Sequence, residues 1–164
     1  MSKELHIHVR SLEIGDFAFV QNLASKQPNF TVPPAYVLWL MLRVKGSICL
    51  IAESSKDGPL AYLVAVPVEG PEKSIFVWQL ASQQSPLREK STLALLTEFR
   101  SLLKTLDVRA VMFSSFPNSA AFRAIRRYAL RVFSSVPKAT NPVAVDVKES
   151  EFLLNLGKPT STAR

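Results

Sequence analysis

Three apolar segments with strand-like composition lie close together in the middle of the chain, and they limit its fold more than any other feature. The segments are Ser47–Glu53, Leu60–Val68 and Ser74–Ser82, and the breaks between them contain Lys56-Asp57-Gly58 and Gly70-Pro71. Short β-rich segments joined by such turn signals pair with their neighbours. The sequence therefore predicts an antiparallel meander, with Leu60–Val68 beside Ser74–Ser82 in the centre of the sheet.

The apolar pattern then changes to a helical period. One apolar stripe consists of Leu93, Leu96, Phe99, Leu102, Leu103 and Leu106. Val108–Ser114 is predicted to be a buried strand, and Ser119–Leu130 an amphipathic helix. That helix would turn Phe122, Ile125 and Ala129 inward and Arg123, Arg126 and Arg127 outward. Val132-Phe133 and Pro142–Val147 are expected to supply closing strands.

The first part of the chain contains one strand and two helices. Leu5–Val9 alternates between apolar residues and histidines, as a half-buried strand does. A helix should follow with Asp16 as its cap, and Ala35–Val44 should form a buried helix after the proline-rich loop Gln27–Pro34. The predicted order β-α-α-β-β-β-α-β-α-β-β describes a mixed α/β fold.

Composition excludes several classes of protein. Of the 164 residues only one is cysteine, Cys49, and only two are histidine, so we expect neither a disulfide scaffold nor a metal site. No apolar run approaches the ~20 residues of a membrane span, and the first residues lack the apolar core of a signal peptide. We therefore expect a cytoplasmic protein with one domain over residues 1–157 and a disordered tail over 158–164. The net charge of +7 favours anionic partners, but no recognition motif points to nucleic acid.

Three segments carry a resemblance to a known family. Ile75–Ala81 resembles the strand F-V-W-Q-V-A of diaminobutyrate acetyltransferases, and Pro117–Ala124 resembles their segment P-D-N-x-A-S-x-A-L-F. Pro33–Leu42 resembles their helix S-x-Y-x-Y-L-L-L, with Tyr36 on the first tyrosine. The chain is thus similar, from about Val9 to Leu154, to this branch of the GCN5-related N-acetyltransferase (GNAT) superfamily.

The resemblance implies a mostly antiparallel central sheet with helices on both faces, and acetyl-coenzyme A as cosubstrate in a cleft. The backbone of Leu80, Ala81 and Ser82 would bind the pantetheine and polarise the thioester carbonyl while the acceptor amine attacks it directly. Many family members protonate the leaving thiolate with a tyrosine, but that position is Ile125 here. Tyr128, one turn later, is the candidate that replaces it.

The family's pyrophosphate-binding loop, Gln/Arg-x-x-Gly-x-Gly/Ala, has no clear equivalent. Gln83–Thr92 contains no glycine, and two alignments are open. With Arg88 in the first position, Ser91 and Leu93 replace the glycines; with Leu87 there, Lys90 and Thr92 do. The resemblance therefore implies that Arg88, Lys90, Ser91 and Thr92 contact the cofactor.

The same segment has a plainer interpretation. Ser85 and Pro86 are a typical cap and first residue of a helix, so the helix could begin at Pro86 and have no phosphate cradle. Further along the chain, Asn118 and Phe122 are expected to face the cofactor, although Asn118 could simply cap its helix.

The acceptor site departs from the diaminobutyrate branch. Tyr36, Trp78 and Glu151 are the candidate substrate-binding residues. The branch carries an acidic residue where this chain has Thr31, and a histidine where it has Lys148. Both exchanges weaken recognition of a diamino acid, so we expect diaminobutyrate not to be the preferred acceptor.

Two functions remain open from the sequence. The first is an acetyl-coenzyme A-dependent N-acetyltransferase that acts on a small-molecule amine. The alternative is a binding module or interaction protein with the same fold that has lost turnover, as the missing glycines would allow. We expect no membrane partner, and a homodimer is compatible with either function.

Overall fold

The computed structural model describes residues 6–70, 72–142 and 149–157, and the order of its elements confirms the predicted one. The strands are β1 (Ile7–Ser11), β2 (Ile48–Ser54), β3 (Gly58–Val68), β4 (Ser74–Ser82), β5 (Ala110–Ser115), β6 (Lys138–Pro142) and β7 (Ser150–Asn155). The α-helices are α1 (Phe17–Ser25), α2 (Ala35–Arg43), α3 (Arg88–Thr105) and α4 (Ala120–Tyr128). A 3-10 turn, η1 (Ile14–Asp16), precedes α1, and a π-helical turn, η2 (Ala129–Phe133), continues α4.

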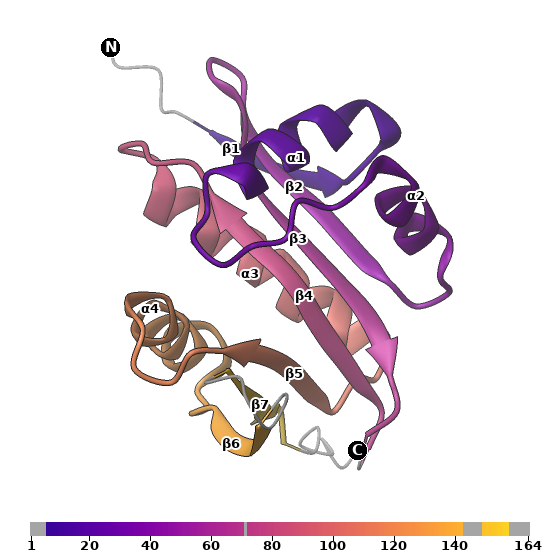
Figure 1. Ribbon diagram of the computed structural model, residues 1–164, viewed down its shortest axis with the longest axis vertical. Coiled ribbons are helices and arrows are strands. Elements are labelled where there is room, and N and C mark those ends of the chain that lie inside the picture. The colour runs from indigo at the N-terminus through magenta and orange to yellow at the C-terminus, as the bar shows by residue number, and fades with distance from the viewer. Residues whose placement is uncertain (1–5, 71, 143–148, 158–164) are drawn as a thin grey trace, which may run out of the picture.

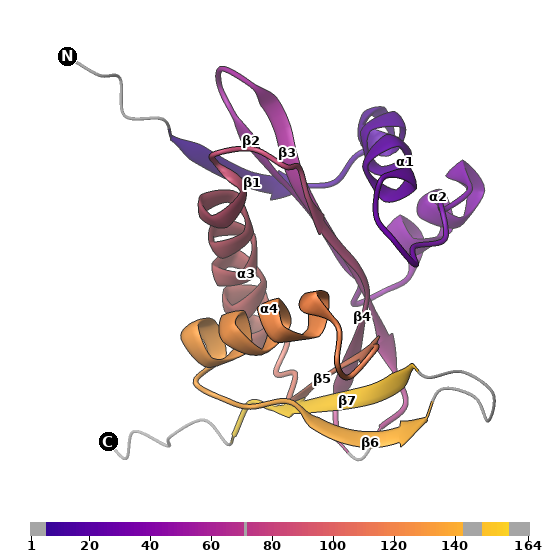
Figure 2. The same ribbon diagram turned by 60° about the vertical axis from the view of Figure 1, so that its left-hand side comes forward.

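All the described strands belong to one seven-stranded sheet with the order β1-β2-β3-β4-β5-β7-β6. Its neighbouring strands are antiparallel except β4 and β5, which run parallel. The predicted meander is therefore confirmed, and so is the central position of β4 (Figure 1). In the rotated view, α1 and α2 lie on one face of the sheet and α3 and α4 on the other (Figure 2).

Each face of the sheet has its own hydrophobic core. The apolar stripe of α3 packs onto β2, β3 and β4, as the helical period predicts, and its Phe99 and Leu103 are fully buried. Leu95, which the predicted stripe did not include, is fully buried there too. On the opposite face, Phe17 and Val20 of α1 pack against Ile51, Tyr62 and their neighbours. Burial of such side chains is the main source of stability of both layers.

Two predicted elements differ from the structure. Helix α2 was predicted to be buried, but Leu38 is the one buried residue of this helix. Val132 and Phe133 form the end of the helical turn η2 rather than a strand. They continue the helical spacing of α4, and Phe133 meets Phe99 of α3 edge to face, with 6.4 Å between ring centroids.

The closing strands are instead the hairpin formed by β6 and β7. Of the predicted strand Pro142–Val147 only Pro142 is described, at the end of β6, and the remainder lies outside the described residues. β1 begins at Ile7, two residues later than predicted. None of the described helices is long and apolar enough to cross a membrane.

Candidate active site

The parallel strands β4 and β5 separate soon after they begin. They pair only over Ser74–Phe76 and Ala110–Met112. Beyond that point, among the residues that the structure describes, β4 pairs only with β3 and β5 only with β7. This leaves what we call the β4–β5 opening, between residues 77–82 of β4 and 113–115 of β5 (Figure 1).

A β-bulge at Trp78 reverses the facing of β4 at the opening. Val77 pairs with Ala65 and Gln79 with Val64, so Trp78 is an extra residue in the ladder. Before the bulge, Val77 packs into the core under α3; after it, Leu80 does. Trp78 and Ala81 pack on the α1 side. The bulge therefore reverses the facing of the residues after Trp78, so that the Gln79 side chain lies on the same face as Trp78, opposite α3.

The backbone of β4 presents groups to the opening that pair with no other described strand. Beyond the strand, the Gln83 N–H donates to the Leu60 carbonyl of β3 at 2.8 Å. Because backbone groups alternate in direction along a strand, those of Ala81 also face β3, whereas those of Leu80 and Ser82 face the opening. Of the three residues predicted to bind through their backbone, Leu80 and Ser82 thus point the required way and Ala81 does not.

A buried amide joins β4 to the loop before α2. The Gln79 side-chain carbonyl accepts a hydrogen bond from the Tyr62 hydroxyl at 2.9 Å, and its NH₂ group donates to the Thr31 backbone carbonyl at 2.8 Å. Burial raises the pKa of Tyr62, so its hydroxyl stays protonated and donates. The sequence did not single out Tyr62, because a buried tyrosine in an apolar strand carries no distinctive pattern.

Helix α3 begins at Arg88, two residues later than the plainer interpretation placed it. Ser85 acts through a local turn: its hydroxyl accepts from the Leu87 N–H at 3.2 Å, and its carbonyl accepts from the Arg88 N–H at 3.1 Å. Pro86 therefore lies in a turn ahead of the helix rather than in its first position.

The hydroxyls of Ser82, Ser91 and Thr92 are used internally. Ser91 and Thr92 both donate to the Arg88 carbonyl, at 3.0 and 2.8 Å. Thr92 Oγ1 also lies 2.6 Å from Ser82 Oγ, which joins the end of β4 to the first turns of α3. All three residues are buried. Their side chains therefore stabilise this corner and do not reach its surface.

Charged side chains surround the start of α3. Arg88 and Lys90 are exposed, and the Arg88 guanidinium donates to the Gln84 side chain at 3.0 Å. Glu89 pairs with Arg131 of η2 at 2.8 Å, which connects η2 to this first turn. A helix N-terminus with cations beside it favours an anion.

The connection from β5 to α4 forms a hollow of about 420 Å³, lined by Phe116, Pro117, Asn118 and Ser119. Ser119 caps α4, since its hydroxyl accepts from the Phe122 N–H at 3.0 Å. Asn118 is therefore not the cap, and it is exposed at the hollow. Phe122 stacks on Phe152 of β7 at 4.3 Å.

The remaining predicted residues fall on two sides of the sheet. Tyr128 is half-buried against the core under α3. Glu151 precedes Phe152, whose ring faces α4, so strand alternation places Glu151 on the opposite face, the face that carries Trp78. Its carboxylate accepts from the Thr140 hydroxyl at 2.7 Å. Tyr36 lies on the exposed side of α2, and Lys148 lies outside the described residues.

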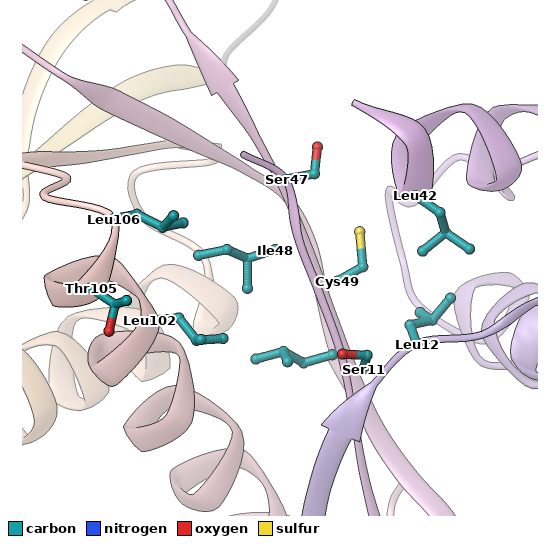
Figure 3. Close-up of a pocket in the computed structure, with 10 residues that line it drawn as sticks. Ser11, Leu12, Leu42, Ser47, Ile48, Cys49, Leu102, Thr105 and Leu106 are labelled. Atoms are coloured by element: carbon teal, nitrogen blue, oxygen red, sulfur yellow. The ribbon is translucent and has the colours of Figure 1, made fainter. Parts of the chain in front are cut away.

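A second cavity, of about 380 Å³, lies at the edge of β2 near the ends of α2 and α3 (Figure 3). Leucine side chains and Cys49 dominate its lining, and burial raises the pKa of the Cys49 thiol to about 11. A neutral thiol is a weak nucleophile. Among the residues that the structure describes, no cluster of three histidine, cysteine or carboxylate side chains could hold a metal ion.

Comparison with known proteins identifies the fold. No family model and no curated protein matches the sequence. The diaminobutyrate acetyltransferase EctA of Paenibacillus lautus, solved with L-2,4-diaminobutyric acid and coenzyme A, has a TM-score of 0.72 and 21% identity, covering 93% of this chain and 96% of that one. The ribosomal-protein-S18-alanine N-acetyltransferase of Escherichia coli has a TM-score of 0.67 and 14% identity, covering 97% and 99%.

The PaiA N-acetyltransferase of Thermoplasma acidophilum, solved with coenzyme A, has a TM-score of 0.69 and 10% identity, covering 92% of this chain and 99% of that one. These neighbours are N-acetyltransferases and they span nearly the whole of the described chain. The protein therefore has the GNAT acetyltransferase fold, as its sequence predicts.

Proposed function

We propose that the protein is an acetyl-coenzyme A-dependent N-acetyltransferase that acts on a small-molecule amine. The observation that carries this proposal is the β4–β5 opening, into which Leu80 and Ser82 direct backbone groups next to the cationic start of α3. Neighbours of the same fold were solved with coenzyme A, which supports this choice of cosubstrate.

Different residues around the opening would bind the pantetheine and the pyrophosphate of this cofactor. The unpaired backbone of Leu80 and Ser82 suits the amide groups of pantetheine. The helix N-terminus at Arg88 suits a pyrophosphate, although no glycine lets the phosphates approach the backbone closely. We therefore assign the phosphate contacts to Arg88 and Lys90, with Asn118 at the opposite wall. Bound acetyl-coenzyme A would supply an acetyl thioester at the opening.

The protein's own groups would then orient the acceptor and move protons. The Leu80 N–H would donate to the carbonyl oxygen on which negative charge develops. Trp78, half-buried on the α1 side, would form the apolar wall of the acceptor site. The Glu151 carboxylate on the same side would accept the proton that an ammonium group must lose before it attacks. Tyr128, on the side of α3 and α4, is the proposed proton donor to the leaving group.

Two measurements test the proposal in order. Acetyl-coenzyme A should raise the free energy of unfolding by about 2.7 kcal/mol at one hundred times its dissociation constant. Thiol release should then reveal turnover with a panel of primary amines. Glu151→Gln should lower kcat/KM while it leaves acetyl-coenzyme A affinity unchanged, and Glu98→Gln on α3 should change neither. Cofactor binding without turnover on any amine would instead favour the non-catalytic binding module.

A further inference from the structure

Helix α2 exposes an apolar stripe that the described part of the chain leaves uncovered. Its nine residues are apolar except for the last, Arg43, yet only Leu38 is buried. The stripe lies opposite Leu38 at helical spacing and consists of Tyr36, Trp39, Leu40, Arg43 and, just after the helix, Val44. Tyr36 is 69% exposed, Leu40 45%, Val44 39% and Trp39 37%. Contiguous exposed apolar side chains of this kind mark interaction surfaces.

The side chains of the stripe form an ordered row along the helix. Tyr36 stacks on Trp39 with 5.9 Å between ring centroids, and the Arg43 guanidinium lies 4.9 Å above the Trp39 ring. The row therefore runs from an aromatic ring at the start of α2 to a cation at its end. Tyrosine, tryptophan and arginine are the side chains that contribute most to protein–protein binding.

We propose that this stripe pairs with the same stripe of a second copy of the chain, as two antiparallel α2 helices related by a two-fold axis. Around a centre between Trp39 and Leu40, the reversed row places each Arg43 against the Tyr36 ring of the other copy. That arrangement is self-complementary, as a two-fold interface must be. The two arginines lie at opposite ends of the helix pair, about 10 Å apart along the helix axes, so that like charges do not meet.

The few charges near α2 favour a second copy of the chain over a lipid surface as the partner of the stripe. Residues 17–52 contain no carboxylate and only three cations, Lys26, Arg43 and Lys45. Attraction to anionic lipid generally takes a cluster of four to eight basic residues. A second copy needs no acidic group, because Arg43 meets a ring. A nine-residue helix forms a small interface, so we expect a reversible dimer with micromolar affinity.

Sedimentation velocity over a range from low micromolar to several hundred micromolar protein tests the dimer. Leu40→Glu places a carboxylate beside the two-fold axis and should weaken dimerisation more than about tenfold. Leu130→Glu is the matched control, since Leu130 is 48% exposed on η2, and it should leave the dimer unchanged. Arg43→Ala removes two symmetric cation–π contacts and should weaken the dimer about 5- to 30-fold. Circular dichroism would verify that each variant is folded.

Crosslinking locates the contact independently. In a Cys49→Ser background, a short bismaleimide should join two copies of Leu40→Cys but not two copies of Leu130→Cys. A chain that stays monomeric at every concentration would overturn the proposal, as would a dimer that tolerates Leu40→Glu. A monomer that sediments with phosphatidylglycerol vesicles through Leu40 would overturn it in favour of a lipid surface.

Discussion

Gln79 joins two elements through opposite ends of one side chain. Its amide connects Tyr62 of β3 to the Thr31 carbonyl in the loop before α2, and all of the side-chain groups involved are buried or half-buried. This network holds the loop against β4 on the side of the bulge. Gln79, next to Trp78, thus positions this loop at the site that we propose for the acceptor.

Replacement of Gln79 by leucine should lower the free energy of unfolding by about 1–3 kcal/mol. The Tyr62 hydroxyl would lose its acceptor inside the core, where water cannot replace it. Urea denaturation of Gln79→Leu, Tyr62→Phe and the double variant would measure this. The double variant should lose less than the sum of the two single losses, because it lacks the Tyr62 hydroxyl that Gln79→Leu alone would strand. Strict additivity would contradict the coupling.

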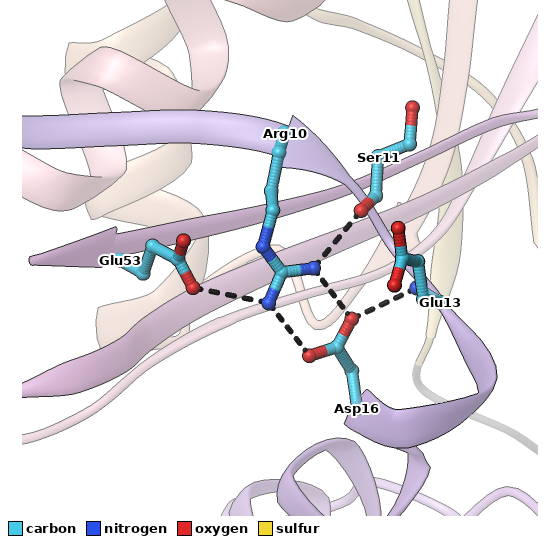
Figure 4. A network of polar contacts seen from close by, with 5 residues as sticks. All are labelled: Arg10, Ser11, Glu13, Asp16 and Glu53. Carbon is cyan, nitrogen blue, oxygen red and sulfur yellow. Dashed lines mark hydrogen bonds and ion pairs between the residues drawn. The ribbon is translucent and has the colours of Figure 1, made fainter.

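Asp16 carries a charge network in place of the simple helix cap that the sequence suggested. Its two carboxylate oxygens accept from Arg10 at 2.8 and 2.9 Å and from the Glu13 N–H at 2.8 Å, whereas no N–H of α1 bonds to them (Figure 4). Arg10 also reaches Glu53 of β2 at 3.0 Å. The hydrogen bond from Arg10 lowers the pKa of Asp16, and the bonds to Asp16 and Glu53 raise that of Arg10.

Because the pKa of Asp16 is lowered, the contribution of this network to the free energy of unfolding depends on pH. Asp16 stabilises the fold above about pH 4, the ordinary pKa of an aspartate, and that contribution is lost as pH falls through its lower pKa in the folded state. Asp16→Asn should therefore cost about 1.5–3 kcal/mol at pH 7 and progressively less below pH ~4. Asp107→Asn, which alters the exposed pair with Arg109, should cost less than ~1 kcal/mol. Equal pH profiles for the two variants would contradict the assignment.

At the scale of elements, the corner between β4 and α3 decides how a phosphate could be held. The small side chains that replace the family's glycines in one alignment or the other, Ser91 and Thr92, are buried and bonded to the Arg88 carbonyl. Arg88 and Lys90 are exposed cations of the same turn, on either side of the exposed Glu89. Side chains rather than backbone would thus carry the anion contacts in the proposed enzyme.

Arg88→Ala and Lys90→Ala should each weaken acetyl-coenzyme A binding by about 1.5–3 kcal/mol, and the affinity of the parent should fall as salt rises. Ser91→Ala should bind nearly as well as the parent, because its hydroxyl serves the helix. Arg100→Ala, an exposed position further along α3, is the control for loss of charge alone. Isothermal titration would measure all four, and a large loss with Ser91→Ala would instead favour a serine that contacts phosphate.

At the level of the whole molecule, the face of the sheet that we propose for the acceptor carries few negative charges. The segment that contains α1, α2 and the loop between them has no carboxylate, and Glu151 on β7 already accepts a bond from Thr140. Diaminobutyrate carries an ammonium group, and the diaminobutyrate branch that the sequence resembles has an acidic residue where this chain has Thr31. The proposed enzyme has an apolar wall at Trp78 and a backbone-bonded Thr31 there instead.

Diaminobutyrate should therefore be acetylated about 10- to 100-fold less efficiently than an amine with an apolar side group, a difference that corresponds to one charge-assisted bond. The kcat/KM values of the two amines would measure it. Thr31→Asp should raise kcat/KM for diaminobutyrate, and Thr31→Asn, which has the same shape without the charge, should not. Efficient acetylation of diaminobutyrate by the parent would overturn this expectation.

Sequence patterns alone predicted the elements from β1 to α4 and their order, but not the positions of the closing strands β6 and β7. The apolar, β-rich composition of Ser74–Ser82 after the turn signal Gly70-Pro71 predicted β4, and helical spacing predicted α3 and the outward arginines of α4. These patterns depend on local conformation and on which face meets water. The central position of β4 followed from the same patterns. Much of the fold could thus be predicted from neighbours along the chain.

The geometry of the candidate site, by contrast, depends on tertiary contacts. The bulge at Trp78, the partner of Gln79 and the burial of Ser91 depend on which strand or helix lies opposite, and no local pattern records that. The exposure of α2 has the same origin: its residues are as apolar as those of a core helix, but the sheet covers only the side that carries Leu38. Hydrophobicity predicts that an apolar side chain is more stable when it is buried. Tertiary packing determines whether the same chain or another molecule buries it.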